Sequence, residues 1–279
     1  MRFWLSLLWY LLSIATADEK KNPLQVTMIS EASQVRAGET FWVGFHLQHP
    51  PGYHSYWKHP GVVGVATKIS WQLPEGFRAG DIVWPAPEKV MMRIHPAQGY
   101  RGEVLLMVPI TAPANWSKPT VTLKVELDWM CCAQGCHPAH RVPFALTVKV
   151  GKEAILHPEH HAMFEKSRQR VPRPDPLWVT TARIDATKII LCVKPAPGNP
   201  RGIKDLGDVW FFSADGAVHS AEPQHKTILA DGTLQLTMMR YEFGPQDLPR
   251  LLGVLRAEKG WHTDSAVPCI EISAPLSKP

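Results

Sequence analysis

After its first residues, the sequence lacks any apolar run long enough to cross a membrane. A spanning helix needs about 20 consecutive apolar residues, and the amino-terminal run from Phe3 to Ala15 is shorter than that. A basic start at Arg2, this short run and Ala15-Thr16-Ala17 before charged residues are typical of a cleaved secretory signal. We therefore expect residues 1–17 to be a signal peptide, and the mature protein to be soluble and periplasmic.

The sequence also lacks the features of nucleic-acid-binding proteins. Its 30 Lys and Arg against 25 Asp and Glu give a net charge of only +5. No stripe of Lys and Arg with interleaved aromatic residues accompanies this charge. The 26 prolines are spread out and 45% of residues are apolar, which indicates a loop-rich β protein rather than disorder. We expect no nucleic-acid partner.

Cysteine is scarce, and its distribution is uneven. Of the five cysteines, Cys131, Cys132 and Cys136 lie close together. An odd number leaves at least one thiol unpaired within the chain, and export allows disulfides to persist. Before them, apolar residues alternate with polar ones over 120–128, which predicts a half-buried strand. The cysteines are therefore expected at the end of this strand.

Cys132 and Cys136 are too far apart in an extended chain to be bonded. An extended segment would separate them by about 13 Å, whereas a disulfide needs Cα atoms within about 4.4–6.8 Å. The chain must therefore bend if they are bonded, and Gly135 and Pro138 permit a turn. A small ring at a strand end is the setting expected of a labile bond.

Three interpretations of this pair stay open. It is a redox-active pair, a static staple of a hairpin, or part of a metal site. Thiolates with imidazoles suit copper(I) or zinc, although the spacings match none of the common zinc patterns. The residues of such a site would be Cys131, Cys132, Cys136, His137 and His140. A second candidate group is formed by His157, His160 and His161, because residues four apart share a helix face.

The rest of the chain predicts an all-β protein with two immunoglobulin-like β-sandwich domains joined by a short helical linker. Short strands with turn residues between them indicate antiparallel sandwiches. Pro158 suits a first helical turn, and the prolines from Pro172 onward end that helix. We expect a cysteine domain at 18–152, a helical and proline-rich linker at 153–175, and a second sandwich at 176–279. The expected strands are 40–47, 68–73, 103–111, 120–128, 142–150, 177–184, 188–193, 208–212, 233–238 and 266–273.

The second sandwich contains two hairpin signals and two cysteines. Asp215-Gly216 and Asp231-Gly232 are strong signals for tight turns between paired strands. Cys192 and Cys269 both lie in β-rich runs. We expect these two cysteines to be close and to form a possible structural disulfide, with two separate buried thiols as the alternative.

Four motifs in register carry a resemblance to a known family. They are Pro51 to Gly61, Trp84-Pro85-Ala86-Pro87, Gly99 to Leu106, and Trp129-x-x-Cys132-x-x-x-Cys136-x-Pro138. In this order they resemble the amino-terminal domain of the bacterial protein-disulfide reductase DsbD, especially in relatives of the suppressor-of-copper-sensitivity protein B. The resemblance covers most of residues 24–150. It implies an immunoglobulin-like fold for this part of the chain.

The resemblance also implies roles for individual residues. Cys136 is the implied nucleophile and Cys132 the residue that resolves the mixed disulfide. A protonated His137 would favour the Cys136 thiolate. Cys131 departs from the family pattern, and strand alternation places it opposite Cys132 as a spare buried thiol. The residues implied to lie near the pair are Tyr53, Tyr56 and Trp57, together with Glu88 in a capping loop at 85–98.

From the resemblance we expect a thiol:disulfide interchange protein that relays reducing equivalents to periplasmic disulfides. The implied electron source is a membrane electron transporter of the DsbD/CcdA type, expected here as a separate protein. The implied clients are periplasmic thioredoxin-like or disulfide-isomerase proteins, and no cofactor is expected. The alternative is a periplasmic copper-binding or metal-tolerance protein that uses the cysteines and histidines as ligands.

Overall fold

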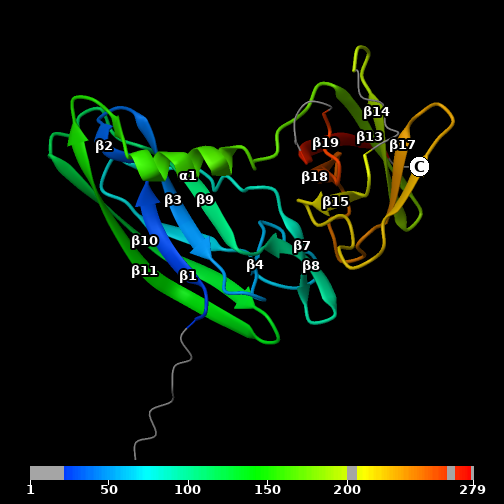
Figure 1. Cartoon of the computed structure of the whole chain (residues 1–279), viewed down its shortest axis with the longest axis horizontal. Helices are drawn as coiled ribbons and strands as arrows, with labels where there is room; N and C mark the ends of the chain where they lie inside the picture. Colours follow the sequence, from blue (N-terminus) through cyan, green and yellow to red (C-terminus); the bar gives the residue numbers. More distant parts are fainter. Residues whose placement is uncertain (1–21, 200–205, 263–267, 278–279) are drawn as a thin grey trace, which may run out of the picture.

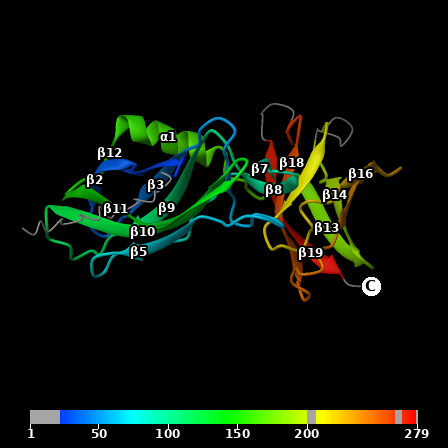
Figure 2. The same ribbon diagram turned by 90° about the horizontal axis from the view of Figure 1, so that it is seen from below.

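Two β-sandwiches lie side by side, with one helix packed on the first (Figures 1 and 2). The computed structural model describes residues 22–199, 206–262 and 268–277. The expected signal peptide, residues 1–17, lies outside this part of the chain. This arrangement of strands confirms the predicted fold class, which is all-β with two immunoglobulin-like sandwiches.

The first sandwich consists of two sheets. One has the strand order β1-β3-β9-β6, and the other has the order β12-β2-β11-β10-β5. All neighbouring strands are antiparallel except β11 and β2. The strands of the first sheet are β1 (Gln25–Ser30), β3 (Thr40–Gln48), β9 (Glu103–Thr111) and β6 (Arg78–Ala79). Those of the second are β12 (Ile155–Leu156), β2 (Ala32–Arg36), β11 (Cys136–Gly151), β10 (Thr120–Cys132) and β5 (Lys68–Gln72).

The alternation in the sequence becomes the inner face of β10. Val121, Leu123, Val125 and Leu127 are all buried, whereas the residues between them face outward. Their side chains share one apolar cluster with Phe45 and Leu106 of the opposite sheet. Strand β10 continues past the predicted end at 128 as far as Cys132, and β11 begins at Cys136. The cysteines are therefore part of the strands rather than of a loop beyond them.

A small third sheet stands between the two sandwiches. It has the order β4-β8-β7, with β4 at Ser55–Tyr56, β7 at Glu88–Met92 and β8 at His95–Tyr100. We call residues 88–100 the cap hairpin. Its turn places Arg93 at a positive φ of 56°. Both ribbon views show β7 and β8 beside the second sandwich.

The one helix in the described part of the chain, α1 (Pro158–Arg168), covers the outer face of the β1-β3-β9 sheet (Figure 1). Pro158 lies in its first turn, as predicted, where a missing backbone N–H costs little. The His157 ring accepts a hydrogen bond from the backbone N–H of His160 and so caps the helix. Phe164 is fully buried against Leu105 and Met107. The helix is therefore packed on the first sandwich and is more than a connection.

The second sandwich is built from a continuous sheet with the order β15-β18-β19-β13-β14-β17-β16. Its core includes Trp178 and Trp261, whose ring centroids are 5.1 Å apart. The strands are β13 (Trp178–Asp185), β14 (Lys188–Pro195), β15 (Val209–Ser213), β16 (His225–Ile228), β17 (Leu234–Met239), β18 (Arg250–Ala257) and β19 (Cys269–Ser277).

One of the two predicted hairpins is present and the other is wrong. Asp231-Gly232 joins β16 and β17, which pair with each other. Asp215-Gly216 follows β15, but β15 pairs with the distant strand β18. The turn itself exists, since Gly216 has a φ of 76°. The dipeptide determined the local bend, whereas the partner of β15 was determined by non-local packing.

The expected disulfide between Cys192 and Cys269 is also wrong, because both thiols are free. Strand β13 lies between their strands. Cys192 pairs with Thr181 of β13, and the next residue, Ala182, pairs with Leu276 of β19. Cys269 is seven residues before Leu276, about 23 Å along an extended strand. The two cysteines share a sheet but lie far apart in it.

Candidate redox site

Cys132 and Cys136 form a disulfide at the tip of the β10–β11 hairpin. They are the last residue of β10 and the first of β11, and they face each other in the strand register. Their Cα atoms are 4.2 Å apart. Between them, the backbone N–H of Ala133 donates to the carbonyl of Gly135 at 2.9 Å. The hairpin geometry brings the two sulfur atoms together.

A bulge in the hairpin makes this pairing possible. Leu127 pairs with Val142, but Trp129 pairs with Ala139, so Asp128 faces two residues of β11. Without this shift, the register would continue and place Cys132 opposite His137 rather than opposite Cys136. Bulges of this kind change the side chain that a strand presents at a given place.

The bulge is held by Asp128 and by an unusual backbone conformation at Arg141. Arg141 has a positive φ of 50°, and its backbone N–H donates to Asp128 Oδ1 at 2.8 Å. The Arg141 side chain forms an ion pair with Glu126 at 2.8 Å. The hydrogen bond from Arg141, opposed by slight burial, lowers the pKa of Asp128. The carboxylate therefore stays charged and keeps accepting that bond at neutral pH.

Gly135 does not have the role expected from the sequence. Its φ is not positive, and a Cβ atom added there would meet nothing within 4 Å. The bend between the cysteines therefore does not need the conformational freedom of glycine. The bend comes from the three-residue loop that the strand register requires.

The two bonded cysteines have different surroundings. Cys132 is fully buried in a small apolar cluster with Tyr56, Val90 and Ala97. Val90 and Ala97 belong to the cap hairpin, so this hairpin covers Cys132. Cys136 is exposed. An incoming thiolate or disulfide therefore meets less cover at Cys136 than at Cys132.

The cap hairpin also contacts the loop between the cysteines. Arg93 Nε, at the tip of the cap, donates to the carbonyl of Gln134 at 3.0 Å. This contact brings a positive charge to the loop beside Cys136. A nearby cation favours the thiolate form of a cysteine. The contact is also on the surface, where it can break without disturbing either core.

On the edge of β10 that faces away from β11, the backbone of His54 binds the backbone of Cys132. The two residues exchange both N–H to O=C hydrogen bonds, each 2.9 Å long. The His54 ring lies 3.3 Å from the hydroxyl of Tyr56, measured from Nε2. Burial, followed by the charge of Arg101, lowers the pKa of His54 to about 4, and burial raises that of Tyr56 to about 12. Both groups are therefore uncharged at neutral pH, so neither places a charge beside Cys132.

Cys131 lies on the other face of β10. It is free, fully buried and part of the main core of the first sandwich. Burial raises its pKa to about 11. His137 packs its ring against Tyr53, with centroids 5.8 Å apart. Its carbonyl accepts a hydrogen bond from Asn22 Nδ2 at 2.8 Å.

Two other expected neighbours lie farther from the sulfur atoms. Trp57 is buried in the main core, and its backbone N–H donates to the carbonyl of Gln98 in the cap hairpin at 3.0 Å. Glu88 begins the cap hairpin and accepts a hydrogen bond from the backbone N–H of Arg101 at 2.9 Å. Neither belongs to the apolar cluster around Cys132. Trp57 and Glu88 thus support the ends of the cap hairpin.

The expected capping loop at 85–98 includes Val90 and Ala97, but sequence reasoning did not single out these two residues as the ones that cover Cys132. The turn between β7 and β8 is formed by Arg93 and Ile94, without the Gly or Asn that signals a tight hairpin. Alternation of Val90 and Met92 with polar or exposed residues was the only available strand signal.

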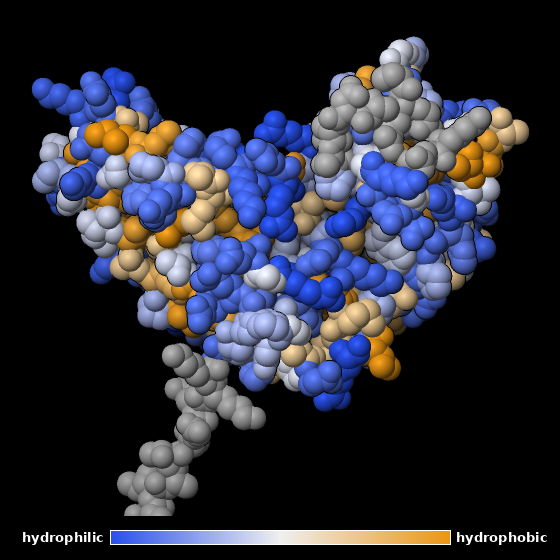
Figure 3. Space-filling model, in the orientation of Figure 1, coloured by the Kyte–Doolittle hydropathy of each residue, from blue (hydrophilic) through white to orange (hydrophobic). Residues whose placement is uncertain are grey.

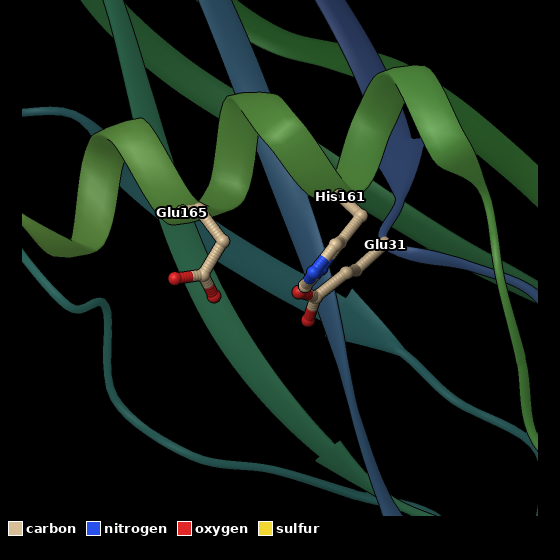
Figure 4. Close-up of side chains that lie close together, drawn as sticks. All are labelled: Glu31, His161 and Glu165. Atoms are coloured by element: carbon tan, nitrogen blue, oxygen red, sulfur yellow. The ribbon is translucent and has the colours of Figure 1, made fainter.

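The second expected histidine group serves the helix. Among the described residues, one group could hold a metal ion through three ligand atoms: Glu31, His161 and Glu165 (Figure 4). Arg168, however, binds Glu31 with both guanidinium nitrogens, at 2.6 and 2.7 Å, and also pairs with Glu165. Its guanidinium group already provides the cation for these carboxylates. The cysteines and the nearby histidines form no such group among the described residues.

No helix in the described part of the chain is long and apolar enough to cross a membrane. Comparison with curated proteins found no match. Comparison with solved structures found the N-terminal periplasmic domain of ScsB from Proteus mirabilis, with 15% identity and a TM-score of 0.64. That match covers 95% of this chain and 97% of the other. It shows that the two proteins share their fold through both sandwiches.

A cohesin module from a Clostridium perfringens family 33 glycoside hydrolase has 11% identity and a TM-score of 0.30, and covers 46% of this chain and 98% of its own. A family model for the N-terminal domain of the thiol:disulfide interchange protein DsbD matches residues 22–147. These residues hold most of the first sandwich, the cap hairpin and the disulfide, whereas the end of β11 and all of β12 lie beyond the match. Residues 22–147 of this chain are therefore similar to the amino-terminal domains of DsbD proteins.

Proposed function

We propose that this protein relays reducing equivalents through the Cys132–Cys136 pair to disulfides in the periplasm. The single observation that carries the proposal is the unequal exposure of the two cysteines. An exposed cysteine, Cys136, is bonded to a buried one, Cys132, which the cap hairpin covers. A staple that only stabilised the hairpin would have no need of a cover over one of its two sulfur atoms.

The exchange proceeds in two balanced steps. In the dithiol form, the Cys136 thiolate attacks one sulfur of a client disulfide, and the other client sulfur leaves as a thiolate that takes up a proton. The Cys132 thiolate then attacks Cys136, which releases the second client sulfur as a thiol. The client gains two electrons and two protons, and the Cys132–Cys136 disulfide is formed. A partner dithiol restores the reduced pair by the same exchange in reverse.

Cys136 suits the first step for electrostatic reasons. A thiolate is favoured by solvent and by nearby positive charge, and disfavoured by apolar burial. Cys136 is exposed and lies beside the loop that Arg93 contacts. Cys132 is buried among uncharged groups. It therefore acts second, when the mixed disulfide is already beside it.

The proposed partners follow from the family. The electron donor is a membrane transporter of the DsbD/CcdA type, and the clients are periplasmic thioredoxin-like or disulfide-isomerase proteins. We place the linker at 153–175, with its β12 and α1 packed on the first sandwich, the second sandwich from 176, and the end of the signal peptide at Ala17. Amino-terminal sequencing of protein from the native host is expected to return Asp18 as the first residue.

Equilibration with thioredoxin buffers of stepped potential tests the relay. The expected result is a reversible shift of Cys132 and Cys136 between dithiol and disulfide, measured by alkylation and mass spectrometry. A pair that stays oxidised at every potential that reduces thioredoxin would be a structural staple, which would overturn the proposal.

Variants assign the two roles. Cys136→Ser is expected to abolish reduction of a client disulfide, whereas Cys132→Ser is expected to accumulate the mixed disulfide. Cys131→Ala is the control, because Cys131 faces the opposite core. If loss of Cys131 is as damaging as loss of Cys132, the pair is wrongly assigned.

A further inference from the structure

A cleft of about 920 Å³ lies between the two sandwiches. One wall is formed by the end of α1 and the segment after it, and the other by Arg256 and by residues 268–270 of the second sandwich. Figure 3 shows a hollow between the two lobes, bordered by strongly hydrophilic residues. The volume lies within the range of about 300–1,000 Å³ that is usual for ligand pockets.

Cationic side chains outnumber carboxylates around this cleft. The carboxylates are Glu88, Glu165 and Asp175; Glu165 pairs with Arg168, and Asp175 lies 2.7 Å from the ring of His262. Glu88 accepts a backbone hydrogen bond. Within the described ranges, no carboxylate forms an ion pair with the remaining cations, which are Lys166, Arg170, Arg173 and Arg256.

Two of these cations come from different sandwiches and converge on one place. Burial raises the pKa of Cys269 to about 11, and the charges of Arg256 and Arg170 both act in the opposite direction. Arg170, Arg256 and Cys269 all line the same cleft. Arg170 is held in place, because its Nη1 donates to the carbonyl of Glu103 at 3.1 Å. Like charges repel, and an anion between them would remove the repulsion.

The geometry points to an anion-binding site in this cleft, for a ligand that bears carboxylates on a partly apolar body. Guanidinium groups bind carboxylates in a bidentate manner and with directional hydrogen bonds. Pro87, Val171 and Ile270 supply apolar wall for the rest of the ligand. A small polycarboxylate and the acidic end of a peptide share this chemistry. The site goes beyond the redox role and does not depend on it.

Titration calorimetry of the full oxidised chain at low salt tests the site, with citrate and a tetraglutamate peptide as two separate probes. At least one probe is expected to bind saturably. The probe that binds more tightly shows whether the ligand is a small polycarboxylate or the acidic end of a peptide. The double variant Arg173→Gln/Arg256→Gln removes two cations that form no ion pair among the described residues, and it is expected to weaken binding at least about tenfold.

Arg183→Gln is the matched control. It removes one positive charge from β13, where Arg183 pairs with Asp185 away from the cleft. Its affinity is expected to stay within about twofold of the wild type. Absence of saturable binding by either probe up to about 10 mM, which would be weaker than almost any specific site, overturns the inference. Equal weakening in the control and in the double variant also overturns it.

A second, independent set of contacts joins the second sandwich to the cap hairpin. Gln98 of β8 is buried, and its Nε2 donates to the carbonyls of Ser213 at 2.9 Å and of His59 at 2.6 Å. The Lys89 ammonium lies 4.3 Å from the ring centroid of Trp210. Gln98 thus links β8 to Ser213, the last residue of β15, and Lys89 links β7 to Trp210 of the same strand.

The segment next to the cap is held in the same way. Val62 donates its backbone N–H to Ser220 Oγ at 3.0 Å. Phe212 and Val254 of the second sandwich belong to the main apolar cluster of the first. Along β8, Ala97 packs on Cys132, whereas the next residue, Gln98, faces the second sandwich. Successive residues of a strand point to opposite sides, so one strand transmits the position of the second sandwich to the disulfide.

We infer that the second sandwich holds the cap hairpin closed over Cys132 and thereby slows reduction of the disulfide, because a thiolate that attacks the exposed Cys136 must expel Cys132 as a thiolate into the apolar cluster beneath the cap. Gln98, Lys89 and Trp210 are positioning residues in this arrangement. The inference deepens the proposed function, since it concerns the same disulfide. Its test needs neither client nor donor, so its failure would leave the relay untouched.

The rate at which dithiothreitol reduces the disulfide of the full oxidised chain measures the closure. Trp210→Ala is expected to raise this rate about fivefold or more, because a cation–π contact worth about 1 kcal/mol is lost. Trp210→Phe keeps an aromatic face for Lys89 and is expected to restore most of the closure.

Trp42→Ala is the matched control. Trp42 is also half-buried and also lies under a cation, Arg168, at 5.5 Å, but it stands beside α1 rather than beside the cap hairpin. It is expected to lower stability without changing the reduction rate by more than about twofold. Equal acceleration in both variants would mean general loosening, and no acceleration in Trp210→Ala would mean that the cap hairpin is held otherwise. Either result overturns the inference.

Discussion

At the scale of single residues, the two ends of one disulfide differ in what they can do chemically. Cys132 is surrounded by apolar and uncharged groups, and Cys136 faces solvent. Cys131, only one residue from Cys132, lies in another core and has a pKa of about 11 because of burial. The one-residue offset along β10 therefore separates a disulfide-bonded sulfur from a buried free thiol.

Gly135→Ala is expected to preserve the fold and the disulfide. The φ of Gly135 is already accessible to alanine and its side-chain position is empty, so the lower backbone entropy of the unfolded chain would stabilise the protein by about 0.5 kcal/mol. Urea denaturation of the oxidised protein measures this change. The control is Gly52→Ala, where φ is +82° and the surroundings are equally open. A loss of stability at Gly135 as large as that at Gly52 would contradict the geometry of the loop.

At the scale of secondary structure elements, a bulge and a helix latch determine where the site lies. The bulge at Asp128 sets the register that pairs Cys132 with Cys136. The latch is Glu31, a buried residue between β1 and β2 that binds α1 through Arg168 and His161. The bulge depends on the carboxylate of Asp128, and the latch depends on the carboxylate of Glu31.

Asp128→Ala is expected to weaken the hairpin by about 1 kcal/mol, because the backbone N–H of Arg141 loses its acceptor. The alternative register, with Cys132 opposite His137, then competes with the native one. In a fixed glutathione buffer, the ratio of disulfide to dithiol is expected to fall several-fold. Glu126→Gln is the control, since Glu126 binds only the side chain of Arg141. An unchanged ratio in Asp128→Ala would show that the bulge does not depend on this carboxylate.

Glu31→Gln is expected to destabilise the protein by about 1–3 kcal/mol, because Arg168 loses a charged partner in a half-buried place. Burial acts to raise the pKa of Glu31, but hydrogen bonds from Arg168 and His161 outweigh it, and the pKa is lowered below 4.5. The contribution of the charged form is therefore present above pH 4.5 and is lost as the pH falls further.

Urea denaturation between pH 3 and pH 7 measures this dependence. The difference between wild type and Glu31→Gln is expected to shrink as the pH falls below about 4.5. Glu165→Gln is the control, because Glu165 is half-exposed and its pair with Arg168 is worth less than about 1 kcal/mol. A difference that stays constant with pH would mean that Glu31 acts through packing alone.

At the scale of the whole molecule, the two sandwiches share contacts that separate domains do not need. Phe212 and Val254 extend the apolar core of the first sandwich, and Gln98 is buried between the two. The cleft with its cations lies along the same junction. The junction is therefore where the redox domain and the second sandwich influence each other.

The full chain is expected to unfold in one calorimetric transition, because opening the junction would expose this shared apolar surface. Differential scanning calorimetry with the van't Hoff and calorimetric enthalpies compared is the measurement. Two separate transitions would contradict the expectation, and would also remove the basis for a rigid cap hairpin. A control at high salt separates this apolar coupling from charge effects, which salt screens.

Much of the architecture could be predicted from local patterns. The alternation before Cys132 predicted β10 and its inner face, and Pro158 with the prolines from Pro172 onward predicted α1. Asp231-Gly232 predicted its hairpin correctly, but Asp215-Gly216 did not, because β15 pairs with a strand far along the chain. Local signals report a residue's nearest neighbours in the chain and say little about which distant strands pair.

The sequence alone determined the two-sandwich β architecture, the helix and the presence of a cysteine pair in a hairpin-forming segment. Only the tertiary structure decided that a bulge aligns Cys132 with Cys136, that Val90 and Ala97 cover one sulfur, and that Cys192 and Cys269 stay apart. The physical reason is that periodicity is fixed within a few residues of the chain. Register, burial and access instead depend on side chains that packing brings together from distant positions.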